Sequence, residues 1–494
     1  MSWTGPLRDA LVAADFTYDR VVELLGEEAH RALGRNETLP GLRATTGGTP
    51  LETLTRLFLL QAPVATAAAE AALPGLVDRL GVAGVLAQSV AEVRARLDCR
   101  PYAADDHDLW LLSDLTPGLD GQPTRVGADH VLGISSAATS LAQLTSREPV
   151  RRALDLGTGC GVQALHLATH AESVVATDVN ERALWLTRLN AELNEVGGIE
   201  PRRGSFYEPV AQERFDLVTT NPPFVISPAT GERLVYRDSG LPGDQVVEHV
   251  VRGLSDVLAD GGTGQVLANW MVLRRRPWDE RLAEWLDPGH DAWVVQRELV
   301  DLPTYVELWL KDAGHHPATG LTSVAEYHQR YDTWLSWLEE QGAEAVGFGW
   351  ITVRAGGAGA HRLEDWPYDV EQPIAPDLTG LLDRTAGLRH LDDAALLAAR
   401  PVTRVDVRQE TYGAAGAEDP EEIVLRQQRL LRRARRADTV EAALVGAFDG
   451  DLTVGQVLDA LGQLLDRDAG ELRAAYLPVV RELVIEGFLT LATG

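Results

Sequence analysis

Between residues 150 and 355 the chain alternates short apolar runs with longer segments in which apolar residues recur every three or four positions. Runs such as RRALDL, SVVATD, FDLVTT and GQVLANW have the length and composition of buried strands. The segments between them, such as GVQALHLATH and DQVVEHVVRGLSDVLAD, have the spacing of amphipathic helices. This alternation predicts an α/β region built on a mostly parallel sheet with helices on both faces.

The chain on either side of this region has helical spacing over most of its length. Residues 1–125 are predicted to be mainly helical and to end in two strands around a polar turn, within VRARLDCRPYAADDHDLWLLSDL. Residues 438–494 are predicted to form three helices and the start of a small wing. Helices that end in a strand pair are typical of a winged helix, although a helical cap of no particular family fits the first segment equally well.

The changes in pattern divide the chain into four predicted parts. Residues 1–125 and 438–494 are the two winged-helix-like ends, and residues 126–356 are the α/β domain. Residues 357–437 are a mixed connecting region that contains proline and glycine and a run rich in arginine, LRQQRLLRRARR.

Composition and charge narrow the classes of function. The formal net charge of −28 disfavours a naked nucleic acid as partner, because an acidic surface repels phosphate groups. Two cysteines far apart in sequence exclude a disulfide framework and a cysteine-rich metal site. The N-terminus lacks the pattern of a signal peptide, and no apolar run approaches the ~20 residues of a membrane span. We therefore expect a cytoplasmic protein.

The sequence ALDLGTGCGVQALHLA carries the first candidate chemistry, because three glycines follow the end of a predicted strand. Gly157, Gly159 and Gly161 come directly after Asp155 and Leu156, at a point where glycine permits a sharp turn and the close approach of a ligand. The dinucleotide fingerprint requires glycine at its sixth position, which is Val162 here. The loop therefore differs from a pyrophosphate-binding loop, and an ordinary glycine turn is the alternative.

Two further positions follow the next predicted strands. Asp178 ends the strand SVVATD, where a carboxylate can bind both hydroxyls of a ribose, and Val179 follows it. The alternative role for Asp178 is to cap the following helix. In PRRGSFYEP, Ser205 and Phe206 are candidates to flank an adenine ring.

In this order the motifs resemble the class I S-adenosylmethionine-dependent methyltransferases over about residues 130–355. The resemblance implies a doubly wound seven-strand sheet and S-adenosylmethionine as cofactor. It assigns the methionine end of the cofactor to the glycine loop (Asp155, Gly157, Thr158, Gly159 and Gly161) and the ribose to Asp178, with Val179 beside it. Many members have aspartate where this chain has Ser205. The stretch that starts at Arg125 resembles the segment that covers the cofactor in related enzymes.

The stretch TTNPPF follows the fourth predicted strand and carries the candidate catalytic residues. Two prolines fix the backbone of Asn221-Pro222-Pro223-Phe224 as a stiff hook. The hook resembles the [N/D/S]-P-P-[Y/F/W] motif of amino- and amide-N-methyltransferases. That resemblance implies that the Asn221 side chain and the Pro222 carbonyl accept hydrogen bonds from a planar NH2 group, on which Phe224 stacks. The resemblance also implies that Asn221 borders the cofactor. The alternative interpretation of the whole hook is a proline-stiffened turn that binds no ligand.

The motif indicates the kind of nitrogen that is methylated. It says less about the molecule that carries this nitrogen. The chain most resembles the small-domain class of release-factor glutamine and ribosomal RNA guanine-N2 methyltransferases, which implies a macromolecular acceptor, protein or RNA. A small-molecule acceptor and a catalytically silent cofactor- or RNA-binding scaffold remain alternatives. The terminal domains are expected to select the substrate.

The remaining polar clusters carry weaker signals. The arginine run could contact RNA, or it could form a solvated helix face that pairs with nearby acids; its arginines are Arg426, Arg429, Arg432, Arg433, Arg435 and Arg436. Residues 274–276 are expected in an exposed loop. His315 and His316 lack further ligands at suitable spacing, so we expect no metal site.

Overall fold

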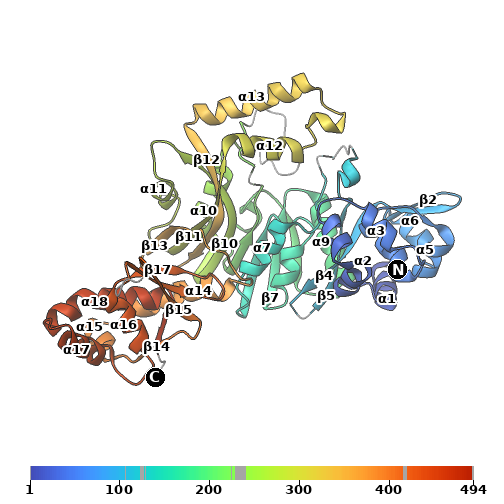
Figure 1. Cartoon of the computed structure of the whole chain (residues 1–494). Coiled ribbons are helices and arrows are strands. Elements are labelled where there is room, and N and C mark those ends of the chain that lie inside the picture. Colours follow the sequence, from blue (N-terminus) through green and yellow to red (C-terminus); the bar gives the residue numbers. More distant parts are fainter. Residues whose placement is uncertain are drawn as a thin grey trace. The chain divides into compact units, whose positions relative to one another are not determined.

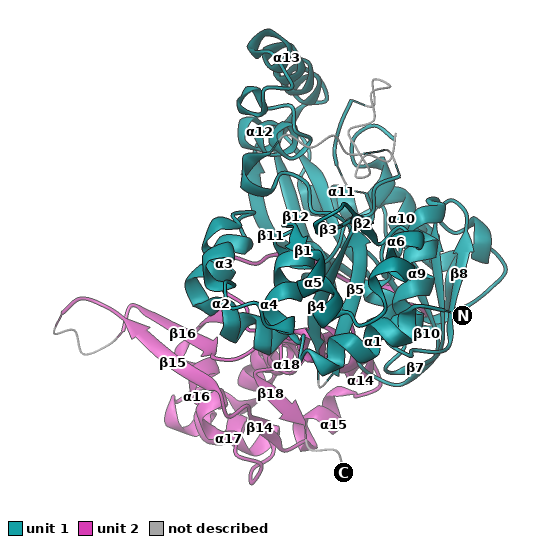
Figure 2. Cartoon of the chain, turned by 90° about the vertical axis from the view of Figure 1, so that its right-hand side faces the viewer, with its two compact units in different colours: residues 1–142, 147–287, 296–351 teal, residues 143–146, 288–295, 352–494 magenta. Residues whose placement is uncertain are grey.

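The computed structural model describes residues 2–105, 107–122, 127, 129–223, 225–228, 241–415 and 420–491. These residues form two compact units (Figure 2). The first comprises residues 1–142, 147–287 and 296–351, and the second comprises residues 143–146, 288–295 and 352–494. The domain boundaries expected from the sequence remain predictions.

The central feature of the fold is a mixed α/β arrangement around one eight-stranded sheet (Figure 1). The strand order is β13-β11-β12-β10-β9-β6-β7-β8. The strands are β6 (Val150–Leu156), β7 (Ala171–Asp178), β8 (Ile199–Arg203), β9 (Phe215–Thr220), β10 (Leu258–Leu273), β11 (Asp291–Asp301), β12 (Ala343–Arg354) and β13 (His361–Asp365). The neighbours β8, β7, β6, β9 and β10 run parallel to one another, which confirms the predicted doubly wound sheet.

The sheet has one strand more than expected. The short strand β13 pairs at the edge, next to β11, within the stretch that the sequence indicated only as a mixed connecting region. Its sequence, HRLED, has no clear apolar alternation. An edge strand can be short and charged because one side of it has no strand partner, and such a strand gives a weak periodic signal.

The order of the strands locates a crevice in the sheet. The chain winds from β6 outward to β7 and β8, then returns to β9 on the other side of β6. Ligands of doubly wound sheets bind at this reversal, outside the carboxyl ends of the strands. The carboxyl ends of β6, β7 and β9 are followed by the glycine loop, Asp178 and the proline hook, respectively.

Helices pack against this sheet where the sequence predicted them. Helix α8 (Val162–Leu167) contacts β6 and β7, α9 (Glu181–Leu193) contacts β7 and β8, and α10 (Gln245–Val257) contacts β10. Helix α11 spans Trp278–Ala283. Between β11 and β12 lie α12 (Leu302–Asp312) and α13 (Val324–Glu340), which pack against each other (Figure 1).

The N-terminal region shares its core with the sheet domain. Its helices are α1 (Thr4–Ala13), α2 (Tyr18–Leu33), α3 (Leu39–Ala44), α4 (Pro50–Leu54), α5 (Thr66–Ala72) and α6 (Val77–Val82). Three short strands form a sheet: β1 (Val64–Ala65), β3 (Glu92–Ala95) and β2 (Leu86–Gln88). The predicted strand pair is confirmed as β4 (Leu97–Ala104) and β5 (His107–Asp114). One hydrophobic cluster joins these elements to the first residues of α8 and the buried face of α9.

The C-terminal region has a core of its own. The three predicted helices are confirmed as α16 (Thr439–Ala447), α17 (Val454–Leu464) and α18 (Ala469–Ile485). They pack with α14 (Ala375–Arg389) and α15 (Asp393–Ala398). Strand β14 (Pro401–Thr403) pairs with β18 (Leu489–Leu491), and β15 (Val407–Tyr412), β16 (Glu422–Gln427) and β17 (Ala434–Ala437) form a separate sheet. A winged-helix arrangement at either end remains a prediction.

Candidate active site

The glycine loop turns immediately after β6. The backbone N–H groups of Gly157 and Thr158 both donate to the carbonyl of Thr177 on the adjacent strand, at 2.9 Å each. Gly157 and Gly159 have φ angles of 78° and 56°, which side chains rarely adopt. A Cβ atom added at either of these two glycines would meet nothing within 4 Å, so the loop leaves room for a ligand to approach its backbone.

The third glycine of the loop has a packing role. Gly161 has a φ angle of 88° and is the N-cap residue of α8. A Cβ atom there would lie 3.1 Å from the Thr187 side chain on α9. The Thr187 hydroxyl also donates to the carbonyl of Gly159 at 3.1 Å. One side of the loop is therefore packed against α9.

Asp155 lies beneath the loop, with its carboxylate turned inward. Its Oδ2 accepts hydrogen bonds from the Thr158 hydroxyl at 2.6 Å and from the backbone N–H of Ala164 at 3.0 Å. Burial raises the pKa of this carboxyl to about 7. Asp155 thus joins the loop to α8, and the cofactor contact predicted for it remains a prediction.

Asp178 is in direct contact with the glycine loop. Its Oδ2 accepts from the N–H of Gly159 at 3.0 Å, and its Oδ1 accepts from the N–H of Asn180 at 2.9 Å. Burial raises the pKa of the Asp178 carboxyl. The cap of α9 is Asn180, whose side chain accepts from the N–H of Arg182, so the helix-capping role belongs to Asn180. Val179 is 61% exposed, as a residue that packs on a bound ring would be.

The residues predicted beside the adenine lie close to Asp178. The N–H of Gly204 donates to the Asp178 carbonyl at 3.1 Å, which brings the turn after β8 to the end of β7. The backbone N–H of Ser205 donates to Glu208 at 3.3 Å. Phe206 has a φ angle of 45°, and its ring meets His249 edge to face with centroids 4.6 Å apart.

The proline hook begins at the reversal of the sheet. The Thr220 hydroxyl at the end of β9 donates to the Leu156 carbonyl at the end of β6, at 2.8 Å. Pro222 is buried, and Asn221 and Pro223 are half-buried. The Oδ1 atom of Asn221 is buried and has no hydrogen-bond partner among the described residues. Phe224 lies outside the described residues, as does Arg125.

An unsatisfied buried acceptor of this kind costs free energy, on the order of 1–3 kcal/mol, unless a donor reaches it. Asn221 therefore has the chemistry expected of a residue that waits for an N–H group. The geometry combines such an acceptor with an open glycine loop and with a carboxylate bound to that loop. All three lie at the carboxyl ends of adjacent strands, where a donor of a methyl group and its acceptor could meet.

The comparisons with known proteins agree with this geometry. Residues 133–238 match the family model described as methyltransferase small domain. This part of the chain is a class I S-adenosylmethionine-dependent methyltransferase domain. Residues 13–96 match a second model, described as a domain of unknown function (DUF7059).

The methyltransferase domain is similar to curated enzymes that modify glutamine. It is 45% identical over 142 residues to the release factor glutamine methyltransferase of Yersinia pestis, over 28% of this chain and 48% of that protein. It is 29% identical over 169 residues to the ribosomal protein uL3 glutamine methyltransferase of Bradyrhizobium diazoefficiens, over 30% of this chain and 52% of that protein. The chain spans about half the length or less of the curated relatives that it matches.

Solved structures show a weaker similarity. A 16S rRNA N2 methyltransferase of T. thermophilus, solved with AdoMet and guanosine, is 18% identical and has a TM-score of 0.26, over 40% of this chain and 52% of that chain. A similarity of this size carries no argument about function. The cofactor of the methyltransferase class is S-adenosylmethionine, and the open loop and the Asp178 carboxylate of this chain fit it.

Two residues outside the predicted set support the methyltransferase domain. Asn190 on α9 donates to the carbonyl of Cys160 in the glycine loop at 2.7 Å. Tyr305 on α12 accepts at its hydroxyl from the N–H of Ile226, just beyond the hook, at 2.8 Å. In the sequence, the only sign of a role for Asn190 is that Asn194 lies four residues after it in a predicted helix. Nothing local distinguishes Tyr305 from an ordinary core tyrosine.

The arginine run is not a helix face, because it occupies β16, β17 and the turn between them. Five of its six arginines pair with carboxylates of the same unit: Arg426 with Glu410, Arg429 with Glu371, Arg433 with Glu364 and Glu486, Arg435 with Glu441 and Glu486, and Arg436 with Glu422. Most of the positive charge of the run is therefore neutralised within the protein.

The other weak candidates lie in ordinary surroundings. Arg276 pairs with Glu284, and His316 caps a short helical turn through the N–H of Ala318.

Among the described residues, no group of three or more histidine, cysteine or acidic side chains is placed to hold a metal ion. Within that same part of the chain, no helix combines the length and the apolar composition needed to cross a membrane.

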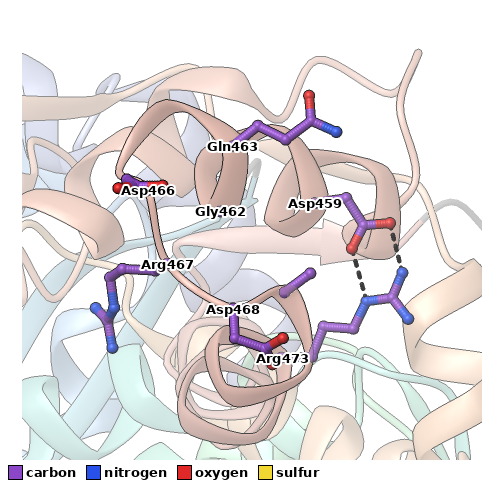
Figure 3. A pocket seen from close by; sticks show the side chains of 8 residues that line it. Asp459, Gly462, Gln463, Asp466, Arg467, Asp468 and Arg473 are labelled. Carbon is purple, nitrogen blue, oxygen red and sulfur yellow. Dashed lines mark hydrogen bonds and ion pairs between the residues drawn. The ribbon is translucent and has the colours of Figure 1, made fainter.

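A hollow of about 670 Å³ lies between α17 and α18 in the C-terminal region. Figure 3 shows Asp459 and Arg473 facing each other at its edge, joined by two hydrogen bonds. The side chains that line it are mostly charged and the hollow is open, so it resembles an ordinary surface depression. None of the residues predicted for the methyltransferase site lines it.

Proposed function

We propose that this protein is an S-adenosylmethionine-dependent N-methyltransferase whose acceptor is the side-chain amide of a glutamine in another protein. The observation that carries the proposal is the buried, unpartnered Oδ1 atom of Asn221 at the end of β9. A primary amide has two N–H donors on a planar nitrogen, so it can satisfy the Asn221 side chain and the Pro222 carbonyl together.

The cofactor would be held by the backbone of the glycine loop and by Asp178. When bound, it would supply an electrophilic methyl group on a sulfonium centre. The role of the protein's own residues would be to orient the acceptor. Asn221 and Pro222 would direct the amide nitrogen, and the rigid prolines would keep this geometry before the acceptor arrives. The rate gain then comes mainly from proximity and orientation.

Three observations favour a protein acceptor over RNA. The relatives with the higher identities, 45%, 40% and 37%, are described as release factor glutamine methyltransferases. The net charge of −28 opposes the approach of a phosphate backbone. The arginine run, which was the sequence feature in favour of RNA, is largely paired with carboxylates of its own unit.

The acceptor is tested by transferring a radiolabelled methyl group into a cell extract. We expect the label to survive ribonuclease and to be lost from the macromolecular fraction after protease. Acid hydrolysis should release it as methylamine, because hydrolysis of an N-methyl amide leaves the methyl group on the nitrogen. Label that is sensitive to ribonuclease would contradict the protein acceptor, and no labelled product would contradict the enzyme.

The role of the hook is tested with Asn221→Ala. We expect the affinity for S-adenosylmethionine, measured by calorimetry, to stay close to that of the wild type. Methyl transfer should fall by about a hundredfold, because the acceptor nitrogen loses its orientation. Asp178→Ala is the complementary variant and should lose cofactor binding itself. Equal binding heats in wild type and Asp178→Ala would overturn the cofactor site.

A further inference from the structure

The free edge of strand β5 is bound by two asparagine side chains of α9. Strand β5 pairs with β4 in a two-stranded sheet of the described chain, so one of its edges has no strand partner there. On that edge Asn194 accepts from the N–H of Trp110 and donates to its carbonyl, both at 2.8 Å. Asn190 does the same for Leu112, at 2.7 and 2.9 Å. Two amides four residues apart on a helix thus replace a neighbouring strand.

Asn190 differs from Asn194 in one contact. Its side-chain nitrogen has two N–H groups, and the second one donates to the carbonyl of Cys160 at 2.7 Å. Cys160 lies between Gly159 and Gly161 in the glycine loop. Asn190 is completely buried, so water cannot replace any of these hydrogen bonds. The second N–H group of Asn194 instead donates to the backbone carbonyl of Asn190, within its own helix end.

The same side of α9 therefore holds both the glycine loop and the pair β4–β5, which we call the N-terminal hairpin. Thr187, one turn before Asn190, donates to the Gly159 carbonyl and leaves no room for a side chain at position 161. Thr187 and Asn190 thus donate to two consecutive carbonyls of the loop, those of Gly159 and Cys160. The two contacts to Leu112 orient the Asn190 amide so that its second N–H group faces Cys160.

We propose that Asn190 is a positioning residue that couples docking of the N-terminal hairpin to the shape of the cofactor loop. The proposal rests on the proposed function, because it takes the glycine loop as the binding site of S-adenosylmethionine. Since coupling between two equilibria is reciprocal, bound cofactor should stabilise the docked hairpin by the same factor by which the hairpin strengthens cofactor binding. The N-terminal region thereby becomes part of the cofactor site without touching the cofactor.

Two matched alanine variants test the coupling. Asn190→Ala removes the contacts to Leu112 and Cys160, whereas Asn194→Ala removes equivalent contacts to the same strand and leaves the loop untouched. By calorimetry we expect Asn190→Ala to weaken S-adenosylmethionine binding about tenfold, the equivalent of one buried hydrogen bond. Asn194→Ala should lower the melting temperature similarly and change the affinity by less than about twofold.

A purely structural role would lower the stability of both variants and leave their affinities alike, and that result would overturn the proposal.

A second measurement uses the wild type alone and does not depend on the variants folding. Hydrogen exchange of the peptide that covers β5 should slow several-fold on saturation with S-adenosylmethionine, while exchange of the β1–β3 pair stays unchanged. Unchanged exchange in β5 would also overturn the coupling. A wild type that gives no binding heat would instead overturn the cofactor assignment on which both ideas depend.

Discussion

At the scale of single residues, two carboxylates beside the glycine loop differ in their contacts: Asp155 is buried and Asp178 is half-buried. The Oδ2 atom of Asp155 accepts from a donor of its own loop and from one of α8, and so it connects these two parts of the backbone. Asp178 accepts from Gly159 and Asn180, and it lies where the loop leaves open space. Burial raises the pKa of both groups. Because Asp178 lies beside the open part of the loop, we expect its ionisation to affect a ligand bound there.

The raised pKa of Asp178 predicts how cofactor affinity depends on pH. A carboxylate accepts hydrogen bonds from ribose hydroxyls, and protonation removes that capacity. As the pH falls through the raised pKa, we expect the affinity for S-adenosylmethionine to decrease, and above it the affinity should be constant. Calorimetry over a pH series measures this effect. Asp178→Asn should bind more weakly and lose the pH dependence, whereas a wild-type affinity that ignores pH would exclude the ribose contact.

The same raised pKa has the opposite consequence for the stability of the free protein. The folded protein holds the protons of Asp155 and Asp178 more tightly than the unfolded chain does. The contribution of these two groups to stability is therefore fully present below the unfolded pKa of about 4 and is lost as the pH rises through the raised folded values. Bound cofactor would offset this loss, because it favours the ionised form of Asp178.

At the scale of elements, the insertion between β11 and β12 supports the segment that follows the hook. Val225 and Ile226 are buried in one cluster with Tyr305, Trp309 and other residues of α12 and α13. The Tyr305 hydroxyl accepts from the N–H of Ile226 inside this cluster. Proline makes the hook stiff, and this packing holds Val225 and Ile226, which follow it.

Removing one hydroxyl group tests that support. In Tyr305→Phe the ring remains and the Ile226 N–H loses its acceptor, which costs about 1–3 kcal/mol. We expect methyl transfer to fall about tenfold while the affinity for S-adenosylmethionine is unchanged. The control is Tyr331→Phe, which removes an exposed hydroxyl that donates to Glu307 at 3.3 Å. Equal transfer rates in the two variants would show that the hook needs no such support.

At the scale of the whole molecule, some of the many acidic residues form ion pairs with arginines inside the protein. Arg433 is 8% exposed and pairs with Glu364 and Glu486, while its guanidinium lies 4.5 Å from the ring centre of Trp366. Burial raises the pKa of Glu364, but the hydrogen bonds and charges of Arg433 and Arg362 outweigh burial and leave that pKa below its ordinary value. These ion pairs connect β13 with the residue directly before β17 and with the C-terminal end of α18.

Substituting two arginines of the same run compares a buried ion pair with an exposed one. Arg433→Ala should lower the free energy of unfolding by about 3–5 kcal/mol, because it leaves buried carboxylates without their partner. Arg436 pairs with Glu422 while its side chain is 84% exposed. Arg436→Ala should stay within about 0.5 kcal/mol of the wild type. Chemical denaturation measures both values, and similar losses would contradict the distinction.

Much of the fold was predictable because its signals are local. Strands β6, β7, β9 and β10 and helices α8–α10 follow from apolar periodicity, which depends on neighbouring residues only. The glycines at 157, 159 and 161, Asp178 and the proline hook were also visible, since turn chemistry and strand ends are local features. Each of them lies in the structure at the strand end where the sequence placed it.

The sequence by itself therefore determined the order of the elements, the glycine loop, the position of Asp178 at the end of β7 and the stiff turn that follows β9. Tertiary structure alone decided the partners of groups that lie far apart in the chain. Arg433 reaches Glu364 across 69 positions, and Asn190 binds Leu112 across 78 positions and Cys160 across 30. No local pattern encodes such pairs, because buried polar groups acquire their partners only when the packed backbone brings them together.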